Sequence, residues 1–330
     1  MKLREFLSTL RGAVVVTSHV NTDPDGLACA YLMARLVEEV GLEAHLCFPG
    51  GISSVSKTIL GRLGMSWQRE CPEDTRTFIL CDFSNPSQLR ELAEKFSDPS
   101  VTLVVVDHHF PEGKLVPLAK LAVVEREPAS AVIAARILMD EGVNVCATLA
   151  TLGIAGILYD TKKLLFASSN TFRVLSWLLD SGGDYRLAHS LLVEEEPRSE
   201  KLAKLKGLLR ASVFEVCGYI VAFTEVSANE ANVARLLVSA GADLAVVVGG
   251  KKESRLSIRV SDELQKAGID AGEIAQSVAS ALGAEGGGHA GAAGVKTTDR
   301  KAHGRMSRAI VNEVIERLFR YLCTQRSGAR

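Results

Sequence analysis

The sequence lacks an excess of charge of either sign. It contains 38 Lys and Arg against 39 Asp and Glu, which gives a formal net charge of −1. This balance argues against a chain that grips long duplex nucleic acid by bulk electrostatics, although it allows a local basic groove. Aromatic residues make up only 5% of the chain, and they are not interleaved as in a stacking platform for a long single strand.

Motifs of paired cysteines are also missing. The seven cysteines form an odd number without a Cys-x-x-Cys pair, at positions 29, 47, 71, 81, 146, 217 and 323. Several lie inside apolar runs, such as the run that ends at Cys81. This pattern predicts buried free thiols in a reducing compartment, and it does not support a zinc ribbon or a disulfide framework.

Long hydrophobic runs are absent as well. No uninterrupted apolar stretch approaches the ~20 residues that a membrane-crossing helix needs. The first ten residues mix Lys2, Arg4 and Glu5 with scattered apolar positions, unlike a signal peptide. We therefore expect a cytoplasmic protein that has no membrane partner.

What the chain does contain is ample core-forming material for two domains. Its 330 residues are 47% hydrophobic, and this length exceeds what one core usually organises. Short apolar runs alternate with helical patterns in the first half, which predicts buried parallel strands in an α/β sheet at 13–17, 77–81 and 102–106. The expected helices of this half cover 27–40, 86–96, 129–140, 146–159, 170–180 and 185–193.

A charge-rich stretch then separates this domain, 1–193, from a smaller α/β domain, 213–330. We interpret the stretch, 194–212, as a partly helical linker. The second domain is expected to contain a hairpin that turns near Gly218 and a glycine-rich loop at 286–294. Its remaining expected strands and helices cover 229–239, 244–248, 255–260, 271–282 and 303–321.

Polar side chains follow three of the predicted strands. The first strand leads into His19, Asp23 and Asp25, the second into Asp82, and the third into Asp107, His108 and His109. Because ligands bind at the carboxyl ends of parallel strands, these side chains are expected at one sheet edge. Taken alone, Asp-Pro-Asp-Gly at 23–26 would be an ordinary turn, in which Asp25 could simply cap the next helix.

The coincidence of these groups points to a metal centre. Four carboxylates and three imidazoles at one edge would repel one another or be costly to desolvate unless a cation neutralised them. A ligand set rich in oxygen, with some nitrogen and no cysteine, favours Mn²⁺ or Mg²⁺ over a structural Zn²⁺. A further acid, Asp160, stands where a long apolar helix breaks, and alone it would be an ordinary helix end.

With these motifs the sequence resembles the DHH phosphoesterases that carry a C-terminal DHHA1 domain, in the branch of nanoRNases and RecJ-like nucleases. The resemblance covers nearly the whole chain. It rests on the His-x-x-x-Asp-x-Asp of 19–25, on Asp82, on Asp107-His108-His109 and on Asp160-Thr161. In the second half it rests on Ser257-Ile-Arg259, Gly286-Gly287-Gly288-His289 and Ala292-Ala-Gly294.

The resemblance implies a role for each position in the metal centre. His19 and Asp23 would hold one ion, Asp25, His108 and Asp160 the other, and Asp82 would bridge the two. Asp107 would orient its neighbours, and His109 would contact the substrate phosphate. Two ions ~3.5–4 Å apart would share a hydroxide that attacks the phosphoryl group in line.

The second domain would recognise the substrate. Glycines let backbone N–H groups approach an anion closely, and the planar guanidinium of Arg259 suits a phosphate. By the resemblance, Arg259, Gly286, Gly287, Gly288 and His289 would clamp a nucleotide across a cleft between the domains. One departure is that Lys162 and Lys163 follow Asp160-Thr161, where many relatives continue with glycine. We interpret the two lysines as a solvated helix start in preference to a source of positive charge near the cleft.

Three functions agree with these features. The first is an exonuclease that trims short single-stranded RNA or DNA and perhaps dephosphorylates 3′-phosphoadenosine 5′-phosphate, since no further domain for extended DNA is present. The second is a phosphodiesterase for cyclic or linear dinucleotides, which no sequence feature separates from the first. The third is a non-catalytic scaffold of a replication complex, which the complete ligand set disfavours, and an inorganic pyrophosphatase is disfavoured by the 286–289 motif. The apolar helices of the first half could also support a homodimer.

Overall fold

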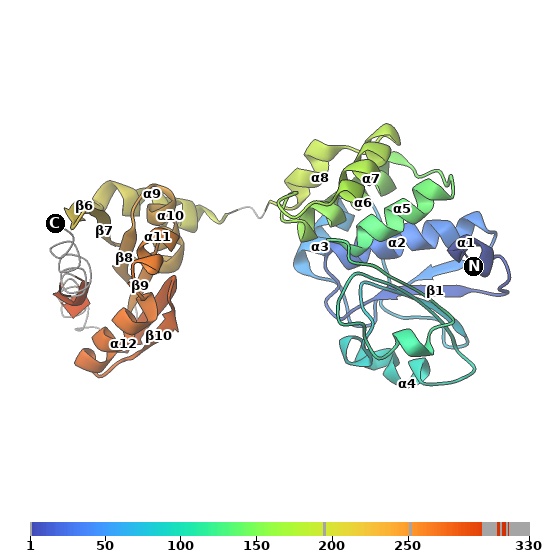
Figure 1. Ribbon diagram of the computed structural model, residues 1–330, viewed down its shortest axis with the longest axis horizontal. Helices are drawn as coiled ribbons and strands as arrows, with labels where there is room; N and C mark the ends of the chain where they lie inside the picture. Colours follow the sequence, from blue (N-terminus) through green and yellow to red (C-terminus); the bar gives the residue numbers. More distant parts are fainter. Residues whose placement is uncertain are drawn as a thin grey trace. The chain divides into compact units, whose positions relative to one another are not determined.

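The chain folds into two compact units, 1–194 and 195–330. The computed structural model describes residues 2–193, 196–250, 253–298, 309–310, 312–314 and 316. Each unit has its own sheet and its own buried cores, and Figure 1 shows the helices that cover each sheet. The prediction of an α/β chain, with a parallel sheet followed by a second, smaller α/β unit, is confirmed.

The first unit is built on a five-stranded sheet in which every pairing is parallel. The strand order is β2-β1-β3-β4-β5. Central strands β1, β3 and β4 are almost wholly buried because both faces of the sheet are covered, which explains their unbroken apolar sequences. The strand bounds are β1 Val14–Ser18, β2 Ala44–Leu46, β3 Thr77–Cys81, β4 Thr102–Asp107 and β5 Leu121–Val124.

Helices form the two layers around this sheet. One face packs against a large helical core, in which α2 contacts both α5 and α6, and the other face packs against a smaller aromatic cluster around Phe78, Phe83 and Phe96. The predicted helix at 86–96 is instead two 3₁₀ turns and the short α4. The helix bounds are α1 Leu3–Leu7, α2 Pro24–Glu39, α3 Ser54–Leu63, α4 Ala93–Phe96, α5 Ser130–Asp140, α6 Ala147–Asp160, α7 Ser169–Asp180 and α8 Tyr185–Leu191.

The second unit contains a six-stranded mixed sheet in the order β10-β11-β9-β8-β7-β6. Only the β7–β8 pairing is parallel among these strands. Helix α12 packs against β10 and β11, and α10 packs against β8 and β9. The bounds are α9 Arg198–Arg210, β6 Ser212–Val216, β7 Tyr219–Glu225, α10 Glu230–Ser239, β8 Leu244–Gly249, β9 Ser254–Val260, α11 Asp262–Lys266, α12 Ala271–Leu282, β10 Glu285–His289 and β11 Ala292–Thr297.

The glycine-rich segment is a strand, so the prediction of a loop there was wrong. Gly286 and Gly288 lie in β10, an edge strand that pairs with β11 in a hairpin. A Cβ on Gly286 would lie 2.7 Å from the Cβ of Ala279 and 2.9 Å from the carbonyl oxygen of Ala275. The glycine therefore lets α12 approach the edge strand closely.

The expected linker is largely helix α9, which packs against α10 and β7 and so belongs to the second unit. The expected helix 303–321 lies largely outside the described residues. None of the helices that the structure describes is long and apolar enough to cross a membrane.

The prediction of free thiols was wrong for Cys47 and Cys71, which form a disulfide, and for Cys217, which is also disulfide-bonded. The loop after α3 returns to the end of β2, where Cys47 pairs with Gln68 in a β-bridge, and this contact brings the two cysteines together. Cys29, Cys81 and Cys146 are free. Cys323 lies outside the described residues.

Candidate metal centre

The register of the parallel sheet aligns the ends of three strands. Ser18 pairs with Cys81, and Cys81 pairs with Val106. The residues that follow these positions, His19, Asp82 and Asp107, therefore emerge side by side at the carboxyl edge of the sheet. The chain adds β2 on one side of β1 and then β3, β4 and β5 on the other, so the topological switch point of the sheet lies between β1 and β3. Open α/β sheets bind their ligands at such a switch point.

At this edge seven side chains form three overlapping groups, each with ligand atoms within 4.8 Å of one another. Asp82 belongs to two of the groups, and His108 also belongs to two. Two groups follow the division of ligands that the family resemblance implied. The groups are His19, Asp23 and Asp82; Asp25, His108 and Asp160; and Asp82, His108 and His109.

Both inner histidines are oriented by backbone carbonyls. The Nδ1 of His108 lies 3.0 Å from the carbonyl oxygen of Glu127, and that of His19 lies 3.0 Å from the carbonyl oxygen of Val20. When Nδ1 carries the proton and donates it to a carbonyl oxygen, Nε2 of the neutral ring carries the lone pair that can bind a metal. The Nε2 of His108 is buried and has no hydrogen-bond partner among the described residues. It lies 3.4 Å from Asp82 and 3.5 Å from Asp160, the surroundings expected of a metal-ligating nitrogen.

Asp25 is fully buried and lies against the start of helix α5. Its two carboxylate oxygens accept hydrogen bonds from the backbone N–H groups of Ser130, at 2.7 Å, and Ala131, at 2.9 Å. These contacts satisfy orphan donors of a helix whose own N-cap, Ala129, has no capping side chain. The first turn of α5 thus fixes the position of a candidate metal ligand.

The acids of the cluster repel one another. Burial, followed by the charges of Asp82, Asp160 and Asp23, raises the pKa of Asp25 well above its usual range. Burial and the charges of Asp23 and Asp82 likewise raise the pKa of Asp160. A cation at this position would relieve the repulsion, since an opposite charge favours the ionised form of each carboxyl.

His19 is surrounded by acids. Burial alone would lower the pKa of His19, but its contacts with Asp23 and Asp82 outweigh burial and raise it to about 10. Its Nε2 lies 3.5 Å from Asp82 and 3.8 Å from Asp23. Nε2 of His19 and the carboxylate oxygens of Asp23 and Asp82 share a proton here, and the same three atoms form a suitable donor set for a divalent cation.

Asp82 holds the central position in an uncommon backbone conformation. It is 2% exposed and has a φ of 63°, in the left-handed region that few residues other than glycine, Asn and Asp enter. Its N–H donates to the carbonyl oxygen of Val106, and its Oδ1 accepts a hydrogen bond of 2.9 Å from the Ser130 hydroxyl. A non-glycine residue held in this region at the centre of a polar cluster is typical of a functional site.

Ser130 was not identified from the sequence. It begins α5, it is completely buried, and it contacts both Asp25 and Asp82. In sequence it is one small residue in Pro-Ala-Ser-Ala, so the only signal was its place at the start of a predicted helix.

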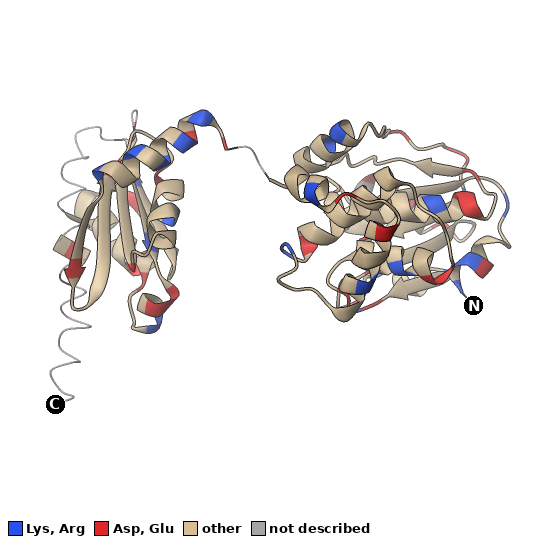
Figure 2. Cartoon of the chain, turned by 90° about the horizontal axis from the view of Figure 1, so that it is seen from above, with Lys and Arg blue, Asp and Glu red and all other residues tan. Residues whose placement is uncertain are grey.

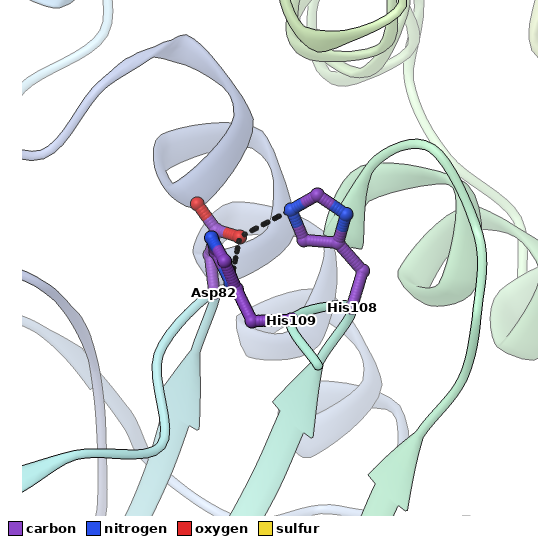
Figure 3. Close-up of side chains that lie close together, drawn as sticks. All are labelled: Asp82, His108 and His109. Atoms are coloured by element: carbon purple, nitrogen blue, oxygen red, sulfur yellow. Dashed lines mark ion pairs between the residues drawn. The ribbon is translucent and has the colours of Figure 1, made fainter. Parts of the chain in front are cut away.

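His109 is fixed by Asp107. Figure 3 shows the rings of His108 and His109 beside the carboxylate of Asp82. The Nδ1 of His109 lies 2.8 Å from Oδ1 of Asp107, which also accepts the N–H of His108. The hydrogen bond with Asp107, only partly opposed by burial, raises the pKa of His109. The His109 side chain is 53% exposed, so it is the member of the cluster best placed to meet a ligand from solvent.

Asp160 ends helix α6, and Thr161 is its C-cap. The expectation that Lys162 and Lys163 begin a helix was wrong. Lys162, Lys163 and Leu164 have φ values of 49°, 58° and 75°, which cannot continue or start a right-handed helix. The two lysines are exposed in the turn between α6 and α7.

The second unit places four of its five expected ligand-binding residues, all except His289, in the lining of one pocket. Its volume is about 850 Å³, and it is lined by β9, β10, β11 and the start of α10. Arg259 and Gly286–Gly288 line it, and Arg259 has no side-chain hydrogen bond or ion pair with any described residue. His289 pairs with Ala292, which pairs with Arg259, so His289 lies in the same cross-strand row.

Comparison with protein families gives two matches. Residues 13–162 match the DHH family, N-terminal domain, and residues 218–318 match the DHHA1 domain. The metal-centre residues all lie within the first match, and the pocket lies within the second.

Individual relatives agree with these matches. The uncharacterized protein MJ0988 of Methanocaldococcus jannaschii is 27% identical over 326 residues, which cover 97% of this chain and 96% of that protein. The A-adding tRNA nucleotidyltransferase of Geobacter sulfurreducens is 28% identical over 206 residues, but the match spans only 23% of that enzyme and 60% of this chain. An exopolyphosphatase-related protein of Bacteroides fragilis shares the fold with a TM-score of 0.54, at 13% identity, over 95% of this chain and 96% of that one.

Proposed function

The chain belongs to the DHH family of phosphoesterases and carries a DHHA1 domain, and from this premise we propose that it hydrolyses phosphate esters of short oligonucleotides with two divalent metal ions. Metal binding and phosphoester hydrolysis are properties of the family. We propose in addition that the substrates are short oligonucleotides, that the enzyme acts as a nuclease, and that its metal is Mn²⁺.

The observation that carries the proposal is a pair of neighbouring ligand groups, one of which contains Asp82. His19 and Asp23 complete the group of Asp82, and Asp25, His108 and Asp160 form the other. Asp82 lies 3.4 Å from Nε2 of His108, so it stands between the two groups. When bound, two ions at such groups neutralise phosphoryl charge and lower the pKa of water. The four carboxylates favour Mn²⁺ or Mg²⁺, and the two imidazole nitrogens favour Mn²⁺ of these two.

The chain's own residues position the reactants. Asp82 is held by Ser130 and by its backbone, Asp25 by the start of α5, and the inner histidines by carbonyl groups. His109, oriented by Asp107, presents its other ring nitrogen to a phosphate oxygen of the substrate. Such fixed geometry removes most of the entropic cost of bringing the reacting groups together.

Recognition of the nucleotide is proposed for the pocket of the second unit. Arg259 is a cation that has no partner within the described residues, and the neighbouring strands present glycines that leave room for a ligand. Positive and negative residues are interspersed over the described parts of both units (Figure 2), which supports a local phosphate clamp over a long electrostatic track.

The test is a hydrolysis time course with Mn²⁺ or Mg²⁺ on a substrate panel. The panel holds a dinucleotide, a five-nucleotide RNA, a long single-stranded DNA, a cyclic dinucleotide, 3′-phosphoadenosine 5′-phosphate and pyrophosphate. Fastest loss of the short linear substrates is the expected result. Preference for the cyclic compound or for pyrophosphate would replace the proposed substrate, and no turnover with metal bound would favour a scaffold.

A further inference from the structure

A buried carboxylate in the pocket of the second unit lacks a partner in the part of the chain that the structure describes. Glu230 is 7% exposed, and its Oε1 is buried without a hydrogen bond to any described residue. It lines the same pocket as Arg259 and begins helix α10. An acid at a helix start is favoured by the helix dipole, but an exposed position would give that benefit without the cost of desolvation.

The surrounding backbone makes room for this carboxylate. Asn229, directly before it, has a φ of 64° and makes no capping bond through its side chain. Gly249 lies opposite, where a Cβ would stand 2.5 Å from Oε1 of Glu230. A strained residue on one side and a glycine on the other therefore hold the Glu230 side chain against the end of β8.

The cations near Glu230 that the structure describes do not neutralise it. Arg255 binds Glu253 at 3.1 Å, and Lys296 lies 3.4 Å from the same glutamate. Arg259, which has no such partner among the described residues, offers the same pocket a positive charge for an anionic group of the ligand. The missing partner of Glu230 is therefore a neutral hydrogen-bond donor on an otherwise anionic ligand.

Strand register divides the pocket floor into rows that run across the sheet. Gly249 pairs with Arg255, which pairs with Lys296, so Glu230 lies at this row. The middle row contains Ser257, Gly294 and Gly287, and the last row contains Arg259, Ala292 and His289. Four residues along a strand separate the Glu230 row from the Arg259 row by roughly 13 Å.

The middle of the floor is nearly bare. A Cβ on Gly287 would meet nothing within 4 Å, which means that open space lies above this strand. The base or the sugar of a nucleotide can lie on such a floor, with the phosphate of the nucleotide toward Arg259 and its hydrogen-bond donors toward Glu230.

We infer that Glu230 is a specificity-determining residue, whose carboxylate accepts hydrogen bonds from paired neutral donors on the nucleoside part of the ligand. The N–H groups of a guanine edge and the hydroxyls of a ribose both offer this chemistry. The inference rests on the proposed function, because it takes the pocket as the nucleotide-binding site of the enzyme.

The experiment measures equilibrium binding to the full chain by calorimetry. The ligands are guanosine monophosphate, inosine monophosphate, which lacks the exocyclic amine, and deoxyguanosine monophosphate, which lacks the 2′-hydroxyl. The variant is Glu230→Gln, and the matched control is Glu285→Gln, because Glu285 lines the same pocket but is exposed.

The wild-type chain is expected to bind the complete nucleotide roughly 10- to 100-fold more tightly than one of the two analogues. Glu230→Gln should lose most of that preference, and Glu285→Gln should keep it. Loss of discrimination against inosine would identify the base edge as the partner, and loss against the deoxy compound would identify the sugar. Equal binding of all three nucleotides to the wild-type chain, no binding, or an unchanged preference in Glu230→Gln would overturn the inference.

Two further readouts separate this result from other causes. The melting temperature of ligand-free Glu230→Gln should equal or exceed that of the wild type, because an unpaired buried charge is removed; a marked drop would indicate a structural role instead. Turnover of p-nitrophenyl phosphate, which has neither base nor ribose, tests the proposed function alone. Absent turnover in the wild type together with the expected binding preferences would reject the esterase and keep Glu230.

Discussion

The two units build their sites on sheets in opposite ways. In the first unit, charged side chains gather beyond the ends of buried parallel strands, and several of them are held by hydrogen bonds, as Ser130 holds Asp82. In the second unit, glycines occupy part of one face of a mixed sheet, and the paired Gly287 and Gly294 leave a floor on which a ligand can lie. Under the proposed function, reaction chemistry depends on the first arrangement and the choice of substrate on the second.

The largest expected effect concerns Asp82, and it should not depend on the substrate. Asp82→Asn keeps the size of the side chain and tolerates the left-handed backbone, but it removes the shared charge. We expect turnover of both a dinucleotide and p-nitrophenyl phosphate to fall to background, with metal content reduced and the circular dichroism spectrum retained. Full activity at wild-type metal content would remove Asp82 from the centre of the site.

Arg259→Ala should have the opposite signature, because we propose a role for Arg259 in recognition and none in the chemical step. We expect the kcat/KM for a dinucleotide to fall by roughly 10- to 100-fold, the cost of a hydrogen bond to a charged group, and p-nitrophenyl phosphate turnover to change little. Arg255→Ala is the matched control, since Arg255 is already paired with Glu253. Equal losses on both substrates would erase the difference between the units.

Ser130→Ala tests whether the partners of the ligands matter as much as the comparison implies. Losing the hydrogen bond to Asp82 should reduce metal affinity or activity by about 10- to 100-fold on both substrates. Titration with Mn²⁺ would separate an affinity effect, which excess metal restores, from an effect on turnover. Wild-type metal affinity and turnover would show that the backbone alone positions Asp82.

A glycine pair offers the smallest and most local test. Gly286→Ala would crowd Ala279 and should lower the free energy of unfolding by about 1–3 kcal/mol, as measured by urea denaturation. Gly287→Ala meets open space, so stability should be unchanged while the KM for a dinucleotide rises. Identical effects of the two substitutions would contradict the assignment of one glycine to helix packing and the other to the pocket floor.

The sequence predicted the site best where a buried apolar strand ends directly at a candidate metal ligand. The apolar runs before Asp82 and Asp107 predict buried parallel strands, and parallel strands place their ends together, so the cluster follows from local patterns. Glu230 and Ser130 carry no such pattern, because their importance depends on which residues the fold brings beside them.

Long-range contacts explain the remaining differences. Cys47 and Cys71 are 24 residues apart, and only the return of a loop to the sheet makes them partners. The glycines of β10 have low strand propensity, and they are strand residues because β11 and α12 impose that geometry.

The left-handed backbone at Asp82 also limits how this protein can evolve. Most substitutions there would strain the turn as well as remove the ligand, so they would be lost with the fold. Asparagine is different, since it accepts the same conformation and one base change converts an Asp codon to an Asn codon. A single mutation at this position could therefore silence the chemistry and leave an intact two-unit protein, which would give descendants of this fold a short path from enzyme to binding partner.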